Sequence, residues 1–175
     1  MAASDAYAIL MERIDYPNSP RLRPVLEMLM TPEQARMVAG LPGSPEEVAQ
    51  KTGFPVEQVR TALDELFFKG VVFAKDFDRR DSFRFARSIV QLHDATQATQ
   101  MRDVVKDRDF YSAWHDFCIN EWYPRHAQLI GQLTKPPQRV IPALKAIKDL
   151  PGVLPEENFH ELLKAQELIA VVPCS

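Results

Sequence analysis

Residues 44–85, SPEEVAQKTGFPVEQVRTALDELFFKGVVFAKDFDRRDSFRF, decide the fold of this chain. The stretch opens with a helix start signal, because Ser44 can cap a helix and Pro45 is favoured at the first helical position. Gly53 ends this short helix, since glycine commonly follows a helix C-terminus. A second helix begins at once, with apolar residues at helical spacing until Gly70. The pattern predicts two helices joined by a tight turn.

The second half of the stretch favours a two-stranded ribbon. Residues 71–74 and 82–85 are rich in β-forming side chains, and the polar segment 76–81 between them is typical of a hairpin loop. Two helices, a tight turn and a ribbon together predict a winged helix-turn-helix domain over residues 1–88. A helical hairpin beside an unrelated β-hairpin would give a similar pattern and is the alternative.

The residues before this stretch favour further helices. Apolar side chains at helical spacing predict helices within 7–14 and 25–30. Thr31 and Pro32 then repeat the start signal, and Gln34 completes a capping box with Thr31. We therefore expect three helices ahead of the quoted stretch.

The next segment, residues 89–134, contains an aromatic helical face. We expect helical structure from Ser88 to Arg108, and then a helix that ends at Tyr123-Pro124. The large side chains on one face of the latter are Phe110, Trp114, Phe117, Cys118 and Trp122. Core packing is the first interpretation. The alternative is a docking surface or homodimer interface formed by Phe110, Trp114, Phe117 and Trp122, because aromatic side chains are enriched at interfaces.

Residues 135–175 predict a small strand–helix–strand subdomain. Residues 139–142 favour a short strand, and Pro155 opens a helix. Residues 168–172 form a continuous apolar run that is typical of a buried strand. The expected fold class is mainly α (α+β): a winged helix with a two-stranded wing, followed by a small helical or α+β C-terminal subdomain.

The composition indicates a folded, soluble protein. The chain has 175 residues, of which 46% are hydrophobic, and 21 basic residues against 24 acidic ones give a net charge of -3. No apolar run approaches the ~20 residues that a bilayer span needs, and no signal-peptide core follows Met1. Two cysteines are too few for a disulfide-stapled scaffold. We expect a cytoplasmic protein with no membrane partner.

The charge pattern of the predicted motif disfavours DNA binding. The exposed positions of its second helix are Glu57, Gln58, Arg60, Thr61, Asp64 and Glu65, one arginine against three carboxylates. Three aspartates flank Arg79 and Arg80 at the ribbon tip. Phosphate contact depends on Lys and Arg, so this helix would repel a DNA backbone. If DNA were bound, the contacting residues would be Gln58, Arg60, Thr61, Arg79 and Arg80.

Motifs for catalysis or metal binding are missing from the sequence. There is no dinucleotide fingerprint, phosphate loop or serine-hydrolase elbow. His115 and Glu121 are six positions apart, and His126 follows Pro124, so no two of them have the i, i+3 or i, i+4 spacing of helical metal ligands. Cys118 is expected in the core rather than as a nucleophile. We therefore predict no enzyme activity, and no cofactor held by these residues.

The last residues, Pro173, Cys174 and Ser175, directly follow the apolar run. Chain termini are normally polar and frayed, whereas a strand leading into Pro-Cys commonly reaches the first ligand of a metal or cluster loop. We therefore expect the natural chain to continue past Ser175, with Cys174 as a metal ligand in that case only. A natural end with an incidental thiol is the alternative.

Four stretches resemble the N-terminal part of anaerobe proteins with a 4Fe-4S dicluster ferredoxin domain. They are LPGSPEEVA (41–49), LFFKGVVF (66–73), RVIPA (139–143) and IAVVPCS (169–175). In that family a winged-helix-like region precedes a cysteine-rich ferredoxin segment, and the Pro-Cys-Ser end continues into further cluster cysteines. The resemblance implies 4Fe-4S clusters in a longer protein only, because a cluster needs four thiolates and Cys174 alone matches a ligand position here.

Taken together, these features predict a non-catalytic winged-helix docking or regulatory module of an iron–sulfur electron-transfer protein. Its partner would be another protein or a redox domain. The motivating features are the acidic second helix, the aromatic face and the Pro-Cys-Ser end. A dimeric DNA-binding transcription regulator is the second hypothesis, and an interaction scaffold without a redox partner in the same chain is the third.

Overall fold

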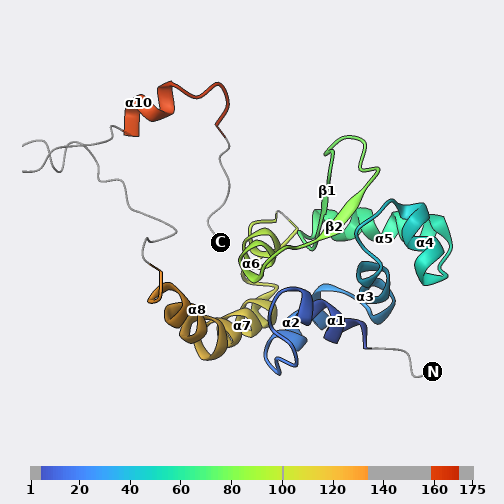
Figure 1. The fold of residues 1–175 in the computed structure, drawn as a ribbon, viewed down its shortest axis with the longest axis horizontal. Coiled ribbons are helices and arrows are strands. Elements are labelled where there is room, and N and C mark those ends of the chain that lie inside the picture. Colours follow the sequence, from blue (N-terminus) through green and yellow to red (C-terminus); the bar gives the residue numbers. More distant parts are fainter. Residues whose placement is uncertain (1–4, 100, 134–158, 170–175) are drawn as a thin grey trace, which may run out of the picture. The chain divides into compact units, whose positions relative to one another are not determined.

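The computed structural model describes residues 5–99, 101–133 and 159–169 (Figure 1). The chain divides into two compact units, the first running to Pro124 and the second comprising Arg125–Val172, and each is described by itself. The described residues are mainly helical, with one small antiparallel sheet. None of the helices in these ranges is both long enough and apolar enough to cross a membrane.

Most described elements belong to the first unit. In chain order they are α1 (Ala6–Arg13), α2 (Leu22–Leu29), α3 (Pro32–Ala39), α4 (Pro45–Thr52), α5 (Val56–Phe68), β1 (Val72–Ala74), β2 (Phe83–Phe85), α6 (Ile89–Gln97), α7 (Arg108–Phe117) and a π-helical turn, η1 (Cys118–Trp122). Helix α8 (Tyr123–Ile130) crosses the border between the units, and α10 (Phe159–Lys164) belongs to the second. The helices and strands expected up to residue 85 are all present.

Side-chain caps explain where α3 and α4 begin. Thr31 Oγ1 accepts a hydrogen bond from the backbone N–H of Gln34 at 3.2 Å, and Gln34 Oε1 accepts one from the N–H of Thr31 at 3.0 Å. Ser44 and Glu47 form the same reciprocal pair at 3.2 and 2.8 Å. Each capping box satisfies two N–H groups that a helix start leaves without partners. Both predicted helix starts are confirmed.

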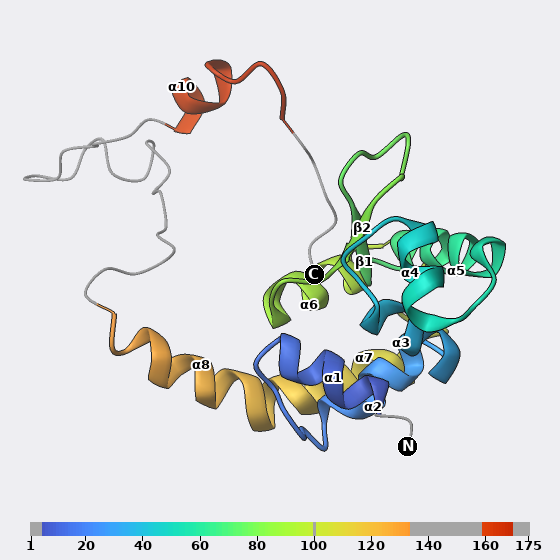
Figure 2. The ribbon, with the colours of Figure 1, turned by 45° about the vertical axis from the view of Figure 1, so that its right-hand side comes forward.

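One hydrophobic core joins α1–α5 to α6 and α7. Its largest fully buried side chains include Leu10, Leu26, Leu63, Leu92, Trp114 and Phe117. Helices α2 and α7, far apart in sequence, pack side by side (Figure 2). The border expected at residue 88 therefore does not separate two cores, because α7 buries its aromatic face against the helices before it.

The ribbon gains a third strand-like segment. Strands β1 and β2 pair antiparallel, with Val72 opposite Phe85. Gly43 forms an isolated bridge with Phe83, in which Gly43 N–H donates to Phe83 O at 3.1 Å and Phe83 N–H donates to Gly43 O at 2.9 Å. The segment that leads into α4 is thereby tied to β2. This non-local pairing has no signature in the sequence.

Gly70 is required where α5 meets α6. Its φ of +76° lies in the left-handed region, and a Cβ there would lie 2.3 Å from the carbonyl oxygen of Ala95. Gly53 has nearly the same φ, +78°, but a Cβ there would have no neighbour within 4 Å. Both glycines end helices as expected, and Gly70 also permits close packing of two chain segments.

The helix expected from Ser88 to Arg108 is interrupted, so that prediction was wrong in part. Helix α6 ends at Gln97, and residues 101–107 form turns and irregular structure. Asp103 Oδ1 accepts the backbone N–H groups of Val105 and Lys106 at 2.9 and 3.0 Å. Such local bonds from aspartate compete with the helical hydrogen-bond pattern.

The aromatic helix does not end at Pro124, contrary to expectation. After α7 the chain makes the π-helical turn η1, in which Tyr123 N–H donates to Cys118 O, and then continues as α8. Pro124 is the second residue of α8 and directly follows the π-helical turn. A regular α-helix would place Trp122 about 80° around the axis from Trp114. The wider turn reduces this offset, and both indoles are buried.

The second unit confirms one expected element. Helix α10 lies in the segment where a helix was predicted. Leu168 and Ile169 are exposed and do not lie in a strand, so the prediction of a buried strand was wrong for these two residues. The described part of the second unit contains no other strand with which they could pair. The strand expected at 139–142 and residues 170–175 lie outside the described residues.

Candidate functional site

The exposed face of α5 carries three of the residues predicted to meet DNA. Gln58 and Thr61 are exposed, and Thr61 Oγ1 donates to the carbonyl of Glu57 at 2.9 Å. The guanidinium of Arg60 forms an ion pair with Glu46 of α4 at 2.5 Å. The only arginine on this helix is therefore already engaged with a carboxylate of its own chain.

The two arginines of the loop between β1 and β2 are engaged in the same way. Arg79 contacts Asp76 at 3.1 Å, and its Nε lies 3.9 Å from Asp81. Arg80 reaches back to α5, where it pairs with Asp64 at 3.4 Å and its guanidinium lies 5.2 Å from the ring centre of Phe68. The structure thus brings the β1–β2 loop and α5 together, but it neutralises the cations that a phosphate backbone would need.

An acidic groove lies between α3 and α5. It has a volume of about 450 Å³, and Met37 and Ala62 contribute its apolar surface. Its charged side chains are Glu33, Glu57 and Glu65, and none of the described residues that line it is basic. The carboxylate of Glu65 forms an ion pair with Lys69 Nζ at 2.6 Å and accepts a hydrogen bond from Gln34 Nε2 at 2.9 Å. Glu33 and Glu57 form no ion pair within the described residues, and such carboxylates beside an apolar floor favour a partially apolar, positively charged partner.

The aromatic face predicted as a possible interface is buried in the first unit's own core. The side chains of Phe110, Trp114, Phe117 and Trp122 are 3%, 1%, 0% and 6% exposed. Phe117 packs edge-on against Tyr16 of the chain's first segment, with ring centres 5.1 Å apart. Core packing is confirmed. The prediction that these four residues form an exposed docking surface was wrong, because α2 and neighbouring segments cover them.

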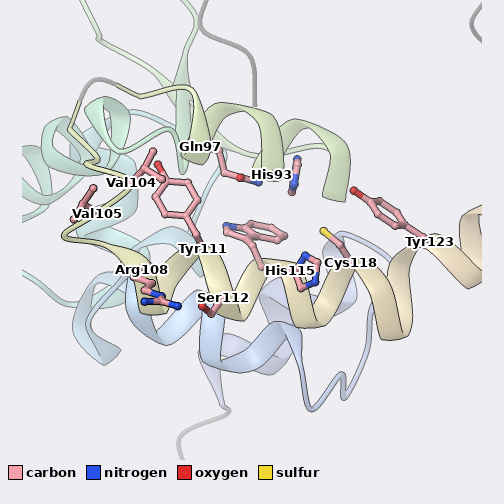
Figure 3. A pocket seen from close by; sticks show the side chains of 11 residues that line it. His93, Gln97, Val104, Val105, Arg108, Tyr111, Ser112, His115, Cys118 and Tyr123 are labelled. Atoms are coloured by element: carbon pink, nitrogen blue, oxygen red, sulfur yellow. The ribbon is translucent and has the colours of Figure 1, made fainter.

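A pocket of about 780 Å³ lies between α6, the turns after it and α7 (Figure 3). Figure 3 shows His93 and Gln97 on α6, facing His115 and Cys118 across it. Among the described residues, its lining includes the apolar side chains Val104, Val105 and Trp114 and no carboxylate. The Gln97 Nε2 and Trp114 Nε1 donors are buried without an acceptor among the described residues. No pattern in the sequence predicts this pocket, because a turn forms one of its walls.

The titratable groups of this pocket are not set up for nucleophilic chemistry. Burial raises the pKa of the Cys118 thiol, which is hydrogen-bonded to Tyr123. Burial, and then the neighbouring thiol, raise the pKa of Tyr123. Both groups are therefore neutral at pH 7, whereas a reactive cysteine needs a lowered pKa. His93 Nδ1 lies 2.9 Å from Asp94 and does not contact Cys118 in any hydrogen bond of the described residues.

The residues present do not fit an iron–sulfur cluster. No group of three or more His, Cys, Asp or Glu within the described ranges could hold a metal ion. Cys118 is buried and Cys174 lies outside the described residues. A 4Fe-4S cluster needs four thiolates, and the chain has two cysteines.

Comparison with known proteins assigns no family to this chain. No family model, curated protein or solved structure matches it. The evidence for what the protein does therefore lies in its own surfaces, above all in the acidic groove and the ion-paired arginines around α5.

Proposed function

We propose that the segment up to residue 88 is a winged-helix domain that docks a basic protein surface through its acidic groove. The order α3, α4, α5, β1, β2 supports the winged-helix assignment. The Gly43–Phe83 bridge supports it further, since it adds a third segment to the ribbon between the first and second helices of the motif. In this proposal the domain is non-catalytic, and α5 faces a protein partner instead of DNA.

The observation that carries the proposal is the charge arrangement around α5. A DNA backbone would have to compete with Glu46 for Arg60 and with Asp64 for Arg80. It would also face Glu33 and Glu57, for which repulsion of phosphate is expected. A lysine or arginine side chain from another protein would be attracted instead, because it could form ion pairs with these carboxylates.

The resemblance to dicluster ferredoxin-domain proteins supports a proposal about the larger protein to which this module belongs. On that ground the module belongs to an iron–sulfur electron-transfer protein, and its partner is a redox domain or the enzyme that exchanges electrons with it. The clusters would be bound by cysteines other than Cys118, with Cys174 as a ligand if the natural chain continues. No step of electron transfer is assigned to the described residues.

A labelled ten-residue lysine peptide tests the groove directly. We expect fluorescence anisotropy to show binding at ~50 mM salt that weakens as salt is added. The variant with Glu33→Gln, Glu57→Gln and Glu65→Gln should lose at least about tenfold in affinity. A matched control, Glu12→Gln with Asp78→Asn and Asp109→Asn, removes the same charge outside the groove and should bind nearly as well as the wild type. Equal losses in both variants would contradict a localised site.

Random duplex DNA separates the proposal from the second hypothesis. We expect no binding to a 20-base-pair duplex at ~50 mM salt, where phosphate-driven affinity is strong. Salt-sensitive binding that is lost in Arg79→Gln with Arg80→Gln would instead establish the wing as a DNA contact. That result would replace protein docking with DNA binding as the function of this domain.

A further inference from the structure

Several arginines of the first unit form no ion pair within the described residues, and three of these line the same pocket. Arginines that pair with carboxylates include Arg21, Arg23, Arg60, Arg79, Arg80 and Arg102. Arg13, Arg84 and Arg87 form no ion pair within the described residues, yet all three line one pocket of about 610 Å³. Neither aspartate nor glutamate is among the described residues that line it. In a chain of net charge -3, this is a local concentration of unneutralised positive charge.

Arg13 is fixed in this pocket by neutral acceptors. At the end of α1, its Nη1 donates to the carbonyls of Leu41 at 3.0 Å and Val38 at 3.4 Å, and its Nη2 donates to Ala39 O at 2.6 Å. These carbonyls belong to the C-terminal end of α3 and the residues after it, where a helix leaves acceptors unsatisfied. The bonds orient the guanidinium but leave its full charge and part of its donor set for a ligand.

Arg84 and Arg87 complete the pocket from β2 and the residues after it. Arg84 Nη1 donates to Gln91 Oε1 at 2.9 Å and to Phe85 O at 3.1 Å, and its guanidinium lies 4.7 Å from the ring centre of Phe73. Burial, and then the charge of Arg87, lower the pKa of Arg84, so the two cations lie close enough to repel each other. The Arg87 guanidinium has no partner within the described ranges. An anion between them would relieve this repulsion.

We propose that the pocket lined by Arg13, Arg84 and Arg87 binds a phosphate-type oxyanion of a small molecule. Guanidinium groups bind tetrahedral oxyanions through paired N–H donors. Three cations match a ligand with two or more negative charges, which a phosphate or pyrophosphate group supplies at neutral pH and a single carboxylate does not. The proposal is independent of the acidic groove, because none of these arginines lines that groove.

Titration calorimetry of the whole chain with pyrophosphate and with inorganic phosphate tests the site. We expect pyrophosphate to bind with a Kd below about 1 mM at ~100 mM salt, more tightly than inorganic phosphate. Arg87→Gln should weaken binding by about tenfold or more. This variant is the informative one, because Arg87 uses its guanidinium in no described contact and its loss should leave folding intact.

The control is Arg36→Gln, which removes one exposed arginine that stacks on Phe54, away from the pocket. We expect it to bind pyrophosphate as the wild type does. Absence of binding in the wild type would overturn the proposal, as would equal weakening in both variants or equally tight binding of succinate. Tighter binding of duplex DNA that is lost in Arg87→Gln would also overturn it, by making the pocket a nucleic-acid contact.

Discussion

The acidic groove and the arginine pocket belong to the same unit but hold their charges in different ways. In the groove, Glu33 and Glu57 project without a bond to the rest of the described chain. In the pocket, Arg13 and Arg84 are oriented by carbonyl and amide oxygens, which fix a cation without cancelling its charge. The groove is therefore adaptable, and the pocket is preorganised for a compact ligand.

Because of this difference, substitutions in the groove should affect mainly ligand binding, whereas substitutions in the pocket should also affect folding stability. Removing the carboxylate of Glu33 or Glu57 changes what the surface attracts and leaves the packing intact, because neither carboxylate bonds to another described residue; Glu65 loses only exposed contacts with Lys69 and Gln34. Removing Arg13 also leaves three backbone carbonyls without a donor from this side chain. The same class of substitution should thus have different consequences for stability in the two regions.

The largest effect should come from the scaffold that supports both regions. Gly70→Ala would force a Cβ to within 2.3 Å of Ala95 O at a φ of +76°, so we expect a loss of about 3–5 kcal/mol in the free energy of unfolding. Gly53→Ala has the same backbone strain without the collision and should cost about 1 kcal/mol. Urea denaturation measures both. Equal losses would show that contact with α6 does not constrain Gly70.

Arg13→Ala should be the most destabilising change among the charged residues. We expect a loss of about 1–3 kcal/mol in the free energy of unfolding, because bonds from a charged donor to the end of α3 disappear. Arg36→Ala, which removes only an exposed stack on Phe54, should cost less than about 1 kcal/mol. Chemical denaturation of the two variants compares them. If they lose the same stability, Arg13 does not hold its pocket together.

Asp76 is a carboxylate held by partners, unlike the groove glutamates. The backbone N–H of Arg79 and then its guanidinium, working against desolvation, lower the pKa of Asp76. A lowered pKa contributes stability at neutral pH that is lost as pH falls through the folded-state value, below about pH 4. Asp76→Asn should therefore lose less stability than the wild type between pH 7 and pH 3. Asp78→Asn removes one carboxylate from the same loop and is the matched control; an equal change in both variants would contradict the role of the Arg79 contacts to Asp76.

The smallest effect on stability is expected in the groove. Replacing Glu33, Glu57 and Glu65 together by glutamine should change the free energy of unfolding by no more than about 0.5 kcal/mol, apart from the lost Glu65–Lys69 pair. Thermal and urea denaturation of this triple variant measure the change. A loss as large as that of Arg13→Ala would remove the distinction between an adaptable groove and a preorganised pocket.

Local signals in the sequence were sufficient for the elements of the first 85 residues. The caps at Thr31 and Ser44, and the glycines at 53 and 70, act over three or four residues, so their effect can be predicted without the fold. The same local reasoning was wrong at Pro124. There a π-helical turn, which packs Trp122 into the core, allows the helix to continue.

The sequence by itself determined the caps, the order of helices and ribbon, and the acidic character of α5, because each depends on neighbours along the chain. The tertiary structure decided which charges far apart in the sequence are compensated. It paired Arg80 of the β1–β2 loop with Asp64 of α5 and joined Gly43 to β2. It also gathered Arg13 with Arg84 and Arg87 in one pocket. Electrostatic partners are set by distance in space, and residues about 70 positions apart become neighbours only when the core brings α1 and β2 together.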